Sequence, residues 1–202
     1  PMPRKFSKKT PNCDAADPTG LDWRTDVAAR VLLRGGVVAH ATEAVFGLAA
    51  SAYDRVACRR IARLKRRSAR KRFIVVGADL AQIQRFVSLE TSLMREILES
   101  WPGPHTWILP ARRTAPRWLK NGRGQIAVRV TAHWQMAVLC GRAGPVVSTS
   151  ANPMGRKPAR TVLAARRYFG NKIECYLGGQ VGPNVGPTAI RDGSTGTIIR
   201  AQ

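Results

Sequence analysis

Short apolar segments alternate with segments of helical periodicity along most of this 202-residue chain. Residues 37–41, 73–78, 106–109, 125–130 and 145–150 read as buried strands. Helices are expected from Asp22 to a stop at Gly35, from a capping Asp54 with Val56, Ile61 and Leu64 on one face, and over Leu80–Val87, Thr91–Trp101, His133–Cys140 and Thr161–Phe169. A closing hairpin is expected around Asp192–Gly196. This order predicts an α/β domain with a mixed sheet.

The composition fits one globular domain at 21–202, preceded by a flexible basic arm at 1–20. Hydrophobic residues make up 44% of the chain, yet no run of 18 apolar residues occurs, so no membrane span or membrane partner is expected. The N-terminus lacks the apolar core of a signal peptide. Four scattered cysteines (Cys13, Cys58, Cys140 and Cys175) indicate free thiols in a reducing cytoplasm.

The formal net charge is +22, from 34 Lys and Arg against 12 Asp and Glu. Self-repulsion makes such a charge unfavourable for folding, so it indicates a polyanionic partner: nucleic acid, nucleotide phosphates, or both. The alternative is a basic surface that is merely solvated.

The familiar nucleotide signatures are absent, including the P-loop and the G-x-G-x-x-G turn, so a nucleotide must be held in another way. Ten Lys or Arg residues and no acidic residue lie between Arg55 and Arg72. Lys65 and Arg67 lie near the expected end of a helix, where they could bind phosphate as a point charge and a fork of donors. A solvated face explains Arg59 and Arg63 equally well.

The stretch "PVVSTSANPMGRKPART" begins as an apolar strand and then becomes polar. Ser148, Ser150 and Asn152 alternate, so they can share one side where the strand leaves the sheet. Ligands of open α/β sheets bind at the carboxyl ends of strands, and small hydroxyls let phosphate oxygens approach backbone amides. The stretch therefore indicates a polar ligand site.

Two further stretches leave alternatives open. Arg129 lies inside the apolar strand "IAVRV", either buried against an anion or pointing to solvent. In "HATEAVFGLAA" the favoured interpretation is a strand end capped by Thr42 with Glu43 in solvent. Trp101 and Trp107 are expected to be core residues.

Five stretches in order, "ATEAVFGL", "KRRSARKRF", "PGPHTWILPA", "IAVRVTAH" and "VSTSANPMG", resemble the YrdC/TsaC family of threonylcarbamoyl-AMP synthases. The closing "PTAIRDGSTGTIIR" is similar to the terminal hairpin of that family, and the resemblance spans residues 22–202. It implies a YrdC-like twisted open mixed sheet with surrounding helices and a basic cavity.

The resemblance also implies an activity: condensation of L-threonine, bicarbonate and ATP into threonylcarbamoyl-adenylate and pyrophosphate, for tRNA threonylcarbamoyladenosine modification. Mg²⁺ is expected with ATP. The implied partners are tRNA or double-stranded RNA, with tRNA-modification proteins as further candidates. The alternative is a non-catalytic RNA-binding factor in tRNA or ribosome maturation. The related hydrogenase-maturation enzymes carry additional modules for which 202 residues leave no room.

The resemblance assigns the site residues to two adjoining parts of one binding site, one for threonine and one for ATP. It assigns no residue to a metal. The threonine side comprises Thr42, Lys71, Arg129, Ser148 and Thr188. The ATP side comprises Lys65, Arg67, Ser150, Asn152 and Arg200, with catalysis assigned to Lys65 and Arg67. The chain departs from the family pattern at His40-Ala41 in place of Tyr-Pro, Ser68 in place of Pro, Arg72, and Pro153-Met154 in place of Leu-Ser.

Overall fold

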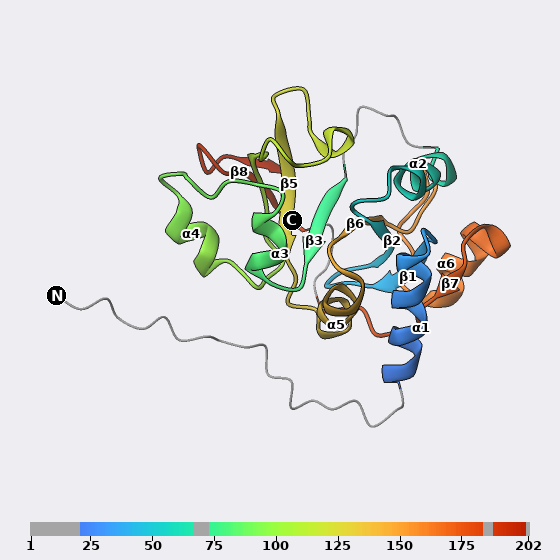
Figure 1. Cartoon of the computed structure of the whole chain (residues 1–202). Helices are drawn as coiled ribbons and strands as arrows, with labels where there is room; N and C mark the ends of the chain where they lie inside the picture. The colour runs from blue at the N-terminus through green and yellow to red at the C-terminus, as the bar shows by residue number, and fades with distance from the viewer. Residues whose placement is uncertain (1–20, 67–72, 184–187, 201–202) are drawn as a thin grey trace.

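One mixed sheet organises the chain (Figure 1). In this computed structural model the described residues are 21–66, 73–183 and 188–200. Their nine strands follow the order β7-β1-β2-β6-β3-β5-β4-β8-β9, and the sheet is open because β7 and β9 form different edges. The strands are β1 (Val38–Ala41), β2 (Phe46–Ser51), β3 (Ile74–Gly77), β4 (Thr106–Pro110), β5 (Gln125–Val130), β6 (Val146–Ser150), β7 (Cys175–Tyr176), β8 (Ile190–Asp192) and β9 (Ile198–Arg200). The predicted open mixed sheet is confirmed.

The expected helices are all present, several with the expected caps. They are α1 (Leu21–Leu33), α2 (Arg55–Leu64), α3 (Leu80–Gln84), α4 (Met94–Glu99), α5 (Trp134–Ala143) and α6 (Val162–Phe169), with single 3₁₀ turns at Arg117–Leu119 and Gly170–Lys172. Asp54 caps α2 by accepting hydrogen bonds from the backbone N–H groups of Val56 and Ala57. The helices α3 and α4 are shorter than the sequence pattern predicts.

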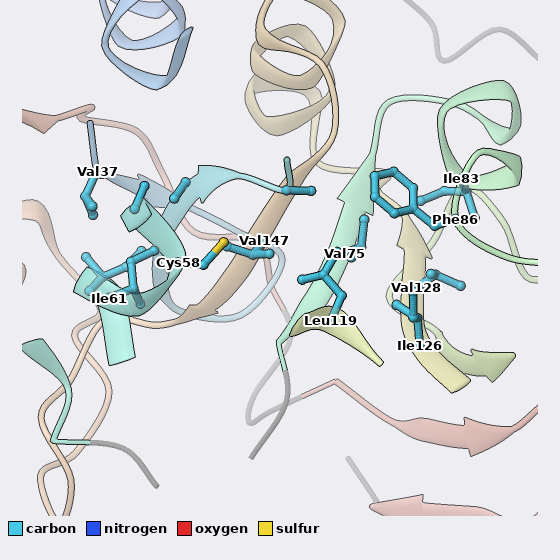
Figure 2. Packing of buried hydrophobic residues seen from close by; sticks show 14 of the residues in the cluster. Val37, Cys58, Ile61, Val75, Ile83, Phe86, Leu119, Ile126, Val128 and Val147 are labelled. Carbon is cyan, nitrogen blue, oxygen red and sulfur yellow. The ribbon is translucent and has the colours of Figure 1, made fainter. Parts of the chain in front are cut away.

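The alternation of side chains along the strands separates two apolar layers. On one face, Val38, Ala49, Val76 and Val146 pack with buried residues of α1 and α5, which lie beside each other (Figure 1). The other face packs against α2, α3 and α6. Figure 2 shows Cys58 and Ile61 of α2 directed at this second layer, together with Ile83 and Phe86 farther along the sheet.

Some predictions about elements were wrong. Val56 is 78% exposed and does not belong to the buried face of α2, which consists of Ala57, Cys58 and Ile61. The strands β2 and β7 were not predicted. By contrast, Trp101 and Trp107 are buried as expected.

Cys58, Cys140 and Cys175 are free, as predicted. Cys13 and the arm at 1–20 lie outside the described residues. Within the described ranges, no helix has the length and apolar character needed to cross a bilayer.

Candidate functional site

A cavity of about 680 Å³ lies over part of the sheet face that α1 and α5 leave uncovered. Its floor comes from neighbouring strands, because Ser148 of β6 is paired with Ile74 of β3, Ile74 with Ala127 of β5, and Ala127 with Ile108 of β4. Gly47 of β2 extends the floor. The volume falls within the range of small-molecule sites.

The charge of the cavity is positive. Lys157 and Arg160, from the segment after β6, line it together with Arg129 and Arg200. Among the described residues that line it there is no Asp or Glu. The pKa of Arg200 is lowered, mainly by burial and to a smaller extent by the nearby positive charge of Arg129. Two guanidinium groups that disfavour each other's charge favour an anionic ligand between or beside them.

Arg129 is buried, with 5% of its surface exposed, and it points to the cavity side of β5. Its Nη2 lies 3.4 Å from Oε2 of Glu43, and its Nη1 donates to the Thr188 hydroxyl at 3.2 Å. Of the two alternatives left open by the sequence, the buried Arg129 with an anionic partner is therefore correct.

Glu43 is also buried, so the interpretation that placed it in solvent was wrong. The Thr131 hydroxyl donates to Oε1 of Glu43 at 2.6 Å. Burial opposes ionisation of this carboxyl, but Arg129 and the Thr131 hydrogen bond outweigh it and hold the pKa of Glu43 below its ordinary value. Glu43 is thus an ionised partner that orients Arg129.

The two threonines at the cavity differ in how they use their hydroxyl groups. The Thr42 hydroxyl donates to the carbonyl oxygen of Val45 at 2.7 Å. Its oxygen also accepts from the backbone N–H groups of Ala44 and Val45, each at 3.4 Å, so it can meet a ligand only as an acceptor. The Thr188 hydroxyl accepts from Arg129, which leaves its hydrogen available as a donor. Arg200 Nη2 donates to the carbonyl oxygen of Thr188 at 2.8 Å and so fixes the start of the terminal hairpin.

The end of β6 is fixed by Lys65, the residue that caps the C-terminus of α2. The Lys65 ammonium donates to the carbonyl oxygen of Ser150, to the carbonyl oxygen of Asn152 at 2.6 Å and to Oδ1 of Asn152 at 3.3 Å. Ser148 and Ser150 line the cavity, whereas Lys65 and Asn152 are not among its lining residues. Lys65 therefore holds the end of β6 and the turn after it without lining the cavity itself.

The predicted site residues fall into three groups. Six line the one cavity: Thr42, Arg129, Ser148, Ser150, Thr188 and Arg200. Lys65 and Asn152 are joined to it through Ser150. Arg67 and Lys71 lie outside the described residues.

Five further polar lining residues were not assigned to the site: Asn121, Gln125, Thr149, Lys157 and Arg160. The basic segment "GRKPAR" directly after the polar strand end could have indicated Lys157 and Arg160. No local pattern indicates Gln125, which reaches the cavity through the pairing of β4 with β5, or Asn121, which is hydrogen-bonded to Gln125.

The residues present do not offer a dedicated metal site. In the described part of the chain, no group of three or more His, Cys, Asp or Glu residues could hold a metal ion. The buried Glu43 is already engaged by Arg129 and Thr131.

Comparison with known proteins adds to this geometry. A model of the Sua5, YciO and YrdC family, described as "Telomere recombination", matches residues 30–201. The chain belongs to this family. A threonylcarbamoyl-AMP synthase of Nitrosococcus oceani is 47% identical over 181 residues, covering 89% of this chain and 98% of the relative. One of Halorhodospira halophila is 46% identical over 180 residues, covering 88% and 94%.

Solved structures of the Sua5/YciO/YrdC family agree with the fold. P. abyssi Sua5 complexed with L-threonine has a TM-score of 0.78 and 31% identity, covering 85% of this chain and 51% of that one. The chain thus spans about half the length of this Sua5 structure. E. coli YciO, at 21% identity, has a TM-score of 0.78, and the match covers 90% of this chain and 89% of YciO.

Proposed function

We propose that the chain is a threonylcarbamoyl-AMP synthase, which condenses L-threonine, bicarbonate and ATP to threonylcarbamoyl-adenylate and pyrophosphate. The observation that carries the proposal is the cavity itself, in which a buried guanidinium lies at the floor and hydroxyl groups and further cations surround it. Relatives of nearly the same length bear the name of this enzyme. A structure of the family was solved with L-threonine.

The two substrates would lie on opposite sides of Ser148 and Ser150. Threonine would bind by its carboxylate to Arg129, with Thr42, Ser148 and Thr188 around its other polar groups, and Lys71 on the same side. ATP would bind toward Ser150, Asn152, Arg200, Lys65 and Arg67. Lys157 and Arg160, which line the cavity after β6, would add positive charge on the phosphate side.

In the proposed reaction the amine of threonine adds to carbon dioxide derived from bicarbonate and loses a proton, giving a carbamate. A carbamate oxygen then attacks the α-phosphorus of ATP, and the bond to the bridging oxygen breaks to release pyrophosphate. The protein forms no covalent bond; it holds the reactants together and neutralises charge on the phosphoryl oxygens. A site of Lys, Arg, Ser and Asn suits this task.

Mg²⁺ would enter as part of the substrate, bound to the phosphates of ATP. The cavity residues described above include no carboxylate that could serve as a dedicated ligand, so the ion would be held by the nucleotide. Its chemistry would be charge neutralisation on the phosphates.

RNA is a second proposed ligand, and tRNA-modification proteins are proposed partners in the cytoplasm. Arg55, Arg59, Arg63 and Arg66 are exposed along α2 and at its C-terminal end. This helix packs on the face of the sheet opposite the cavity floor, so RNA bound there would not block the substrates. A non-catalytic RNA-binding factor would use the same helix and would have no need for the cavity.

The proposed activity is tested by incubating the full chain with ATP, L-threonine and bicarbonate and detecting threonylcarbamoyl-adenylate by mass spectrometry. We expect the product only when all three substrates are present, with one pyrophosphate released per product. L-Serine and L-valine are matched controls, since each lacks one part of the threonine side chain. Failure to form the adenylate with threonine by a folded chain would contradict the proposal.

A further inference from the structure

His40 of β1 lies behind Ser148, one of the residues that line the cavity. The His40 side chain is buried, with 1% exposed, and its Nε2 lies 3.4 Å from the Ser148 hydroxyl oxygen. Its Nδ1 lies 2.9 Å from the carbonyl oxygen of Ala41. Since a carbonyl oxygen can only accept, Nδ1 must carry a hydrogen and donate it.

The approach of His40 to Ser148 depends on Gly47. Gly47 is the cross-strand partner of His40 in the β1–β2 pair, and β2 separates β1 from β6. A Cβ atom at this position would lie 2.9 Å from Nε2 of His40 and 3.1 Å from the hydroxyl oxygen of Ser148. A side chain at position 47 would therefore occupy the space through which the two groups meet.

The charge state of His40 follows from its surroundings. Burial is the largest cause and lowers the pKa of His40 to about 4, against the opposing hydrogen bond to the Ala41 carbonyl; the smaller contributions of His133, Glu43 and Arg129 differ in sign. The imidazole is therefore neutral at pH 7. With the hydrogen on Nδ1, Nε2 is an acceptor, and the Ser148 hydroxyl is the donor that faces it.

We propose that His40 is a positioning residue that fixes the polarity of the Ser148 hydroxyl, so that Ser148 presents only lone pairs to the cavity. A ligand group that contacts Ser148 must then be a donor, such as the ammonium or hydroxyl of an amino acid. A phosphate oxygen is disfavoured at this position. The assignment of the donor to threonine rests on the proposed function.

The hydrogen position on His40 is tested directly in the unmodified chain. Long-range ¹H–¹⁵N correlation spectra report which imidazole nitrogen is protonated, and the chain has only three histidines to assign. His40→Gln identifies the His40 signals by their loss. We expect a protonated Nδ1 and an unprotonated Nε2 at pH 7. A protonated Nε2 would overturn the proposal, whatever the protein binds.

The effect on the ligand is tested by a double-mutant cycle with calorimetric titration of L-threonine and, separately, of ATP. His40→Phe keeps a ring of similar volume but removes the acceptor, and we expect it to weaken threonine binding about threefold to tenfold. His40→Gln can place its Oε1 near the position of Nε2, and we expect it to restore most of the affinity. ATP affinity should change less than about twofold in both variants.

The cycle separates positioning from general damage. In a Ser148→Ala background, His40→Phe should have no further effect on threonine binding, because the hydroxyl it orients is gone. Equal losses in both backgrounds, or equal losses for threonine and ATP, would show a merely structural His40 and overturn the proposal. If the unmodified chain binds no threonine, the proposed function fails instead, and the imidazole spectra still decide the arrangement of His40.

Discussion

Arg129 and Glu43 meet in the interior from positions far apart in the chain, and each is the nearest counter-charge of the other. Removing one partner of a buried pair leaves an uncompensated charge and costs about 3–5 kcal/mol of folding free energy. In a single Arg129→Ala variant, weaker ligand binding could therefore not be distinguished from unfolding of the chain. Arg129→Ala combined with Glu43→Gln removes both charges and is the better test of the site.

In that double variant we expect threonine binding to weaken by about 30-fold to several-thousand-fold, while ATP binding changes little. Lys65→Ala should do the reverse and act mainly on ATP, because the Lys65 ammonium holds the carbonyl groups of Ser150 and Asn152. Calorimetric titration of each ligand into each variant measures both effects. If both variants lost both ligands equally while remaining folded, the two-sided site would be wrong.

Two buried titratable groups predict how folding stability depends on pH. His40 has a folded-state pKa of about 4 against 6.5 in the unfolded chain, so only the unfolded state binds its proton between these values. Stability is therefore full above about pH 6.5 and falls as the pH drops toward 4, by on the order of 3 kcal/mol. The lowered pKa of Glu43 adds a further loss below its ordinary value of 4.5.

Urea unfolding of the chain between pH 7.5 and 4.5 measures this dependence. His40→Gln should flatten the curve between about pH 6.5 and 4.5, since it removes the titrating group. The titratable and charged groups that face His40 (Glu43, Arg129 and His133) remain in that variant. Identical slopes for the two proteins would show that His40 does not stay neutral in the fold.

At the scale of elements, capping residues and apolar patterns in the sequence predicted most helices and strands. Elements that leave no such pattern in their own residues were missed. Asp54 and Thr161 mark the starts of α2 and α6 through their capping oxygens, which a sequence displays directly. The strand β2 has no polar alternation, because it is buried on both faces, and so it was not recognised. The two-residue β7 is too short to leave a pattern.

The site residues divide in the same way, into those that their own segment of sequence predicts and those whose role depends on residues far away in the chain. The polar end of β6 is visible in the sequence, and Ser148 and Ser150 line the cavity as expected. The burial of Glu43 is not visible, because it depends on Arg129 and Thr131, which follow it by more than 80 residues. A lone glutamate after a strand is most often solvated, and only the fold brings its partners together.

The exposed face of α2 carries the prediction about RNA. Changing Arg55, Arg59 and Arg63 together to Gln should weaken RNA binding and make the slope of log K against log salt less negative by about 2 to 3. The matched control changes Arg24, Arg30 and Arg34 to Gln, since these exposed residues belong to α1 and the turn after it, on the opposite face of the sheet. Filter binding over a range of salt concentrations measures both slopes. Equal changes in the two variants would assign the effect to net charge alone.

At the scale of the whole molecule, a net charge of +22 is divided between the cavity and the outer surface. The cavity cations serve the nucleotide and the carboxylate in the proposed function, and those of α2 remain for a larger polyanion. The family match begins at residue 30, and the segment 1–20 lacks apolar periodicity.

We therefore expect a chain that begins at residue 21 to make the adenylate at the rate of the full chain. The rate of pyrophosphate release under saturating substrates, together with the thermal unfolding midpoint, measures activity and fold side by side. Loss of synthesis by a shortened chain that unfolds at the same temperature would assign a catalytic task to the arm.

The central claim, that this cavity joins a threonine carbamate to the α-phosphate of ATP, is tested most directly by isotope exchange. The full chain is incubated with ATP, labelled pyrophosphate and bicarbonate, with and without L-threonine. Because formation of the adenylate is reversible while pyrophosphate is present, we predict that label enters ATP only when threonine is supplied, and that the double Arg129→Ala, Glu43→Gln variant loses this threonine-dependent exchange. No exchange by the folded chain, or exchange at the same rate without threonine, would contradict the account.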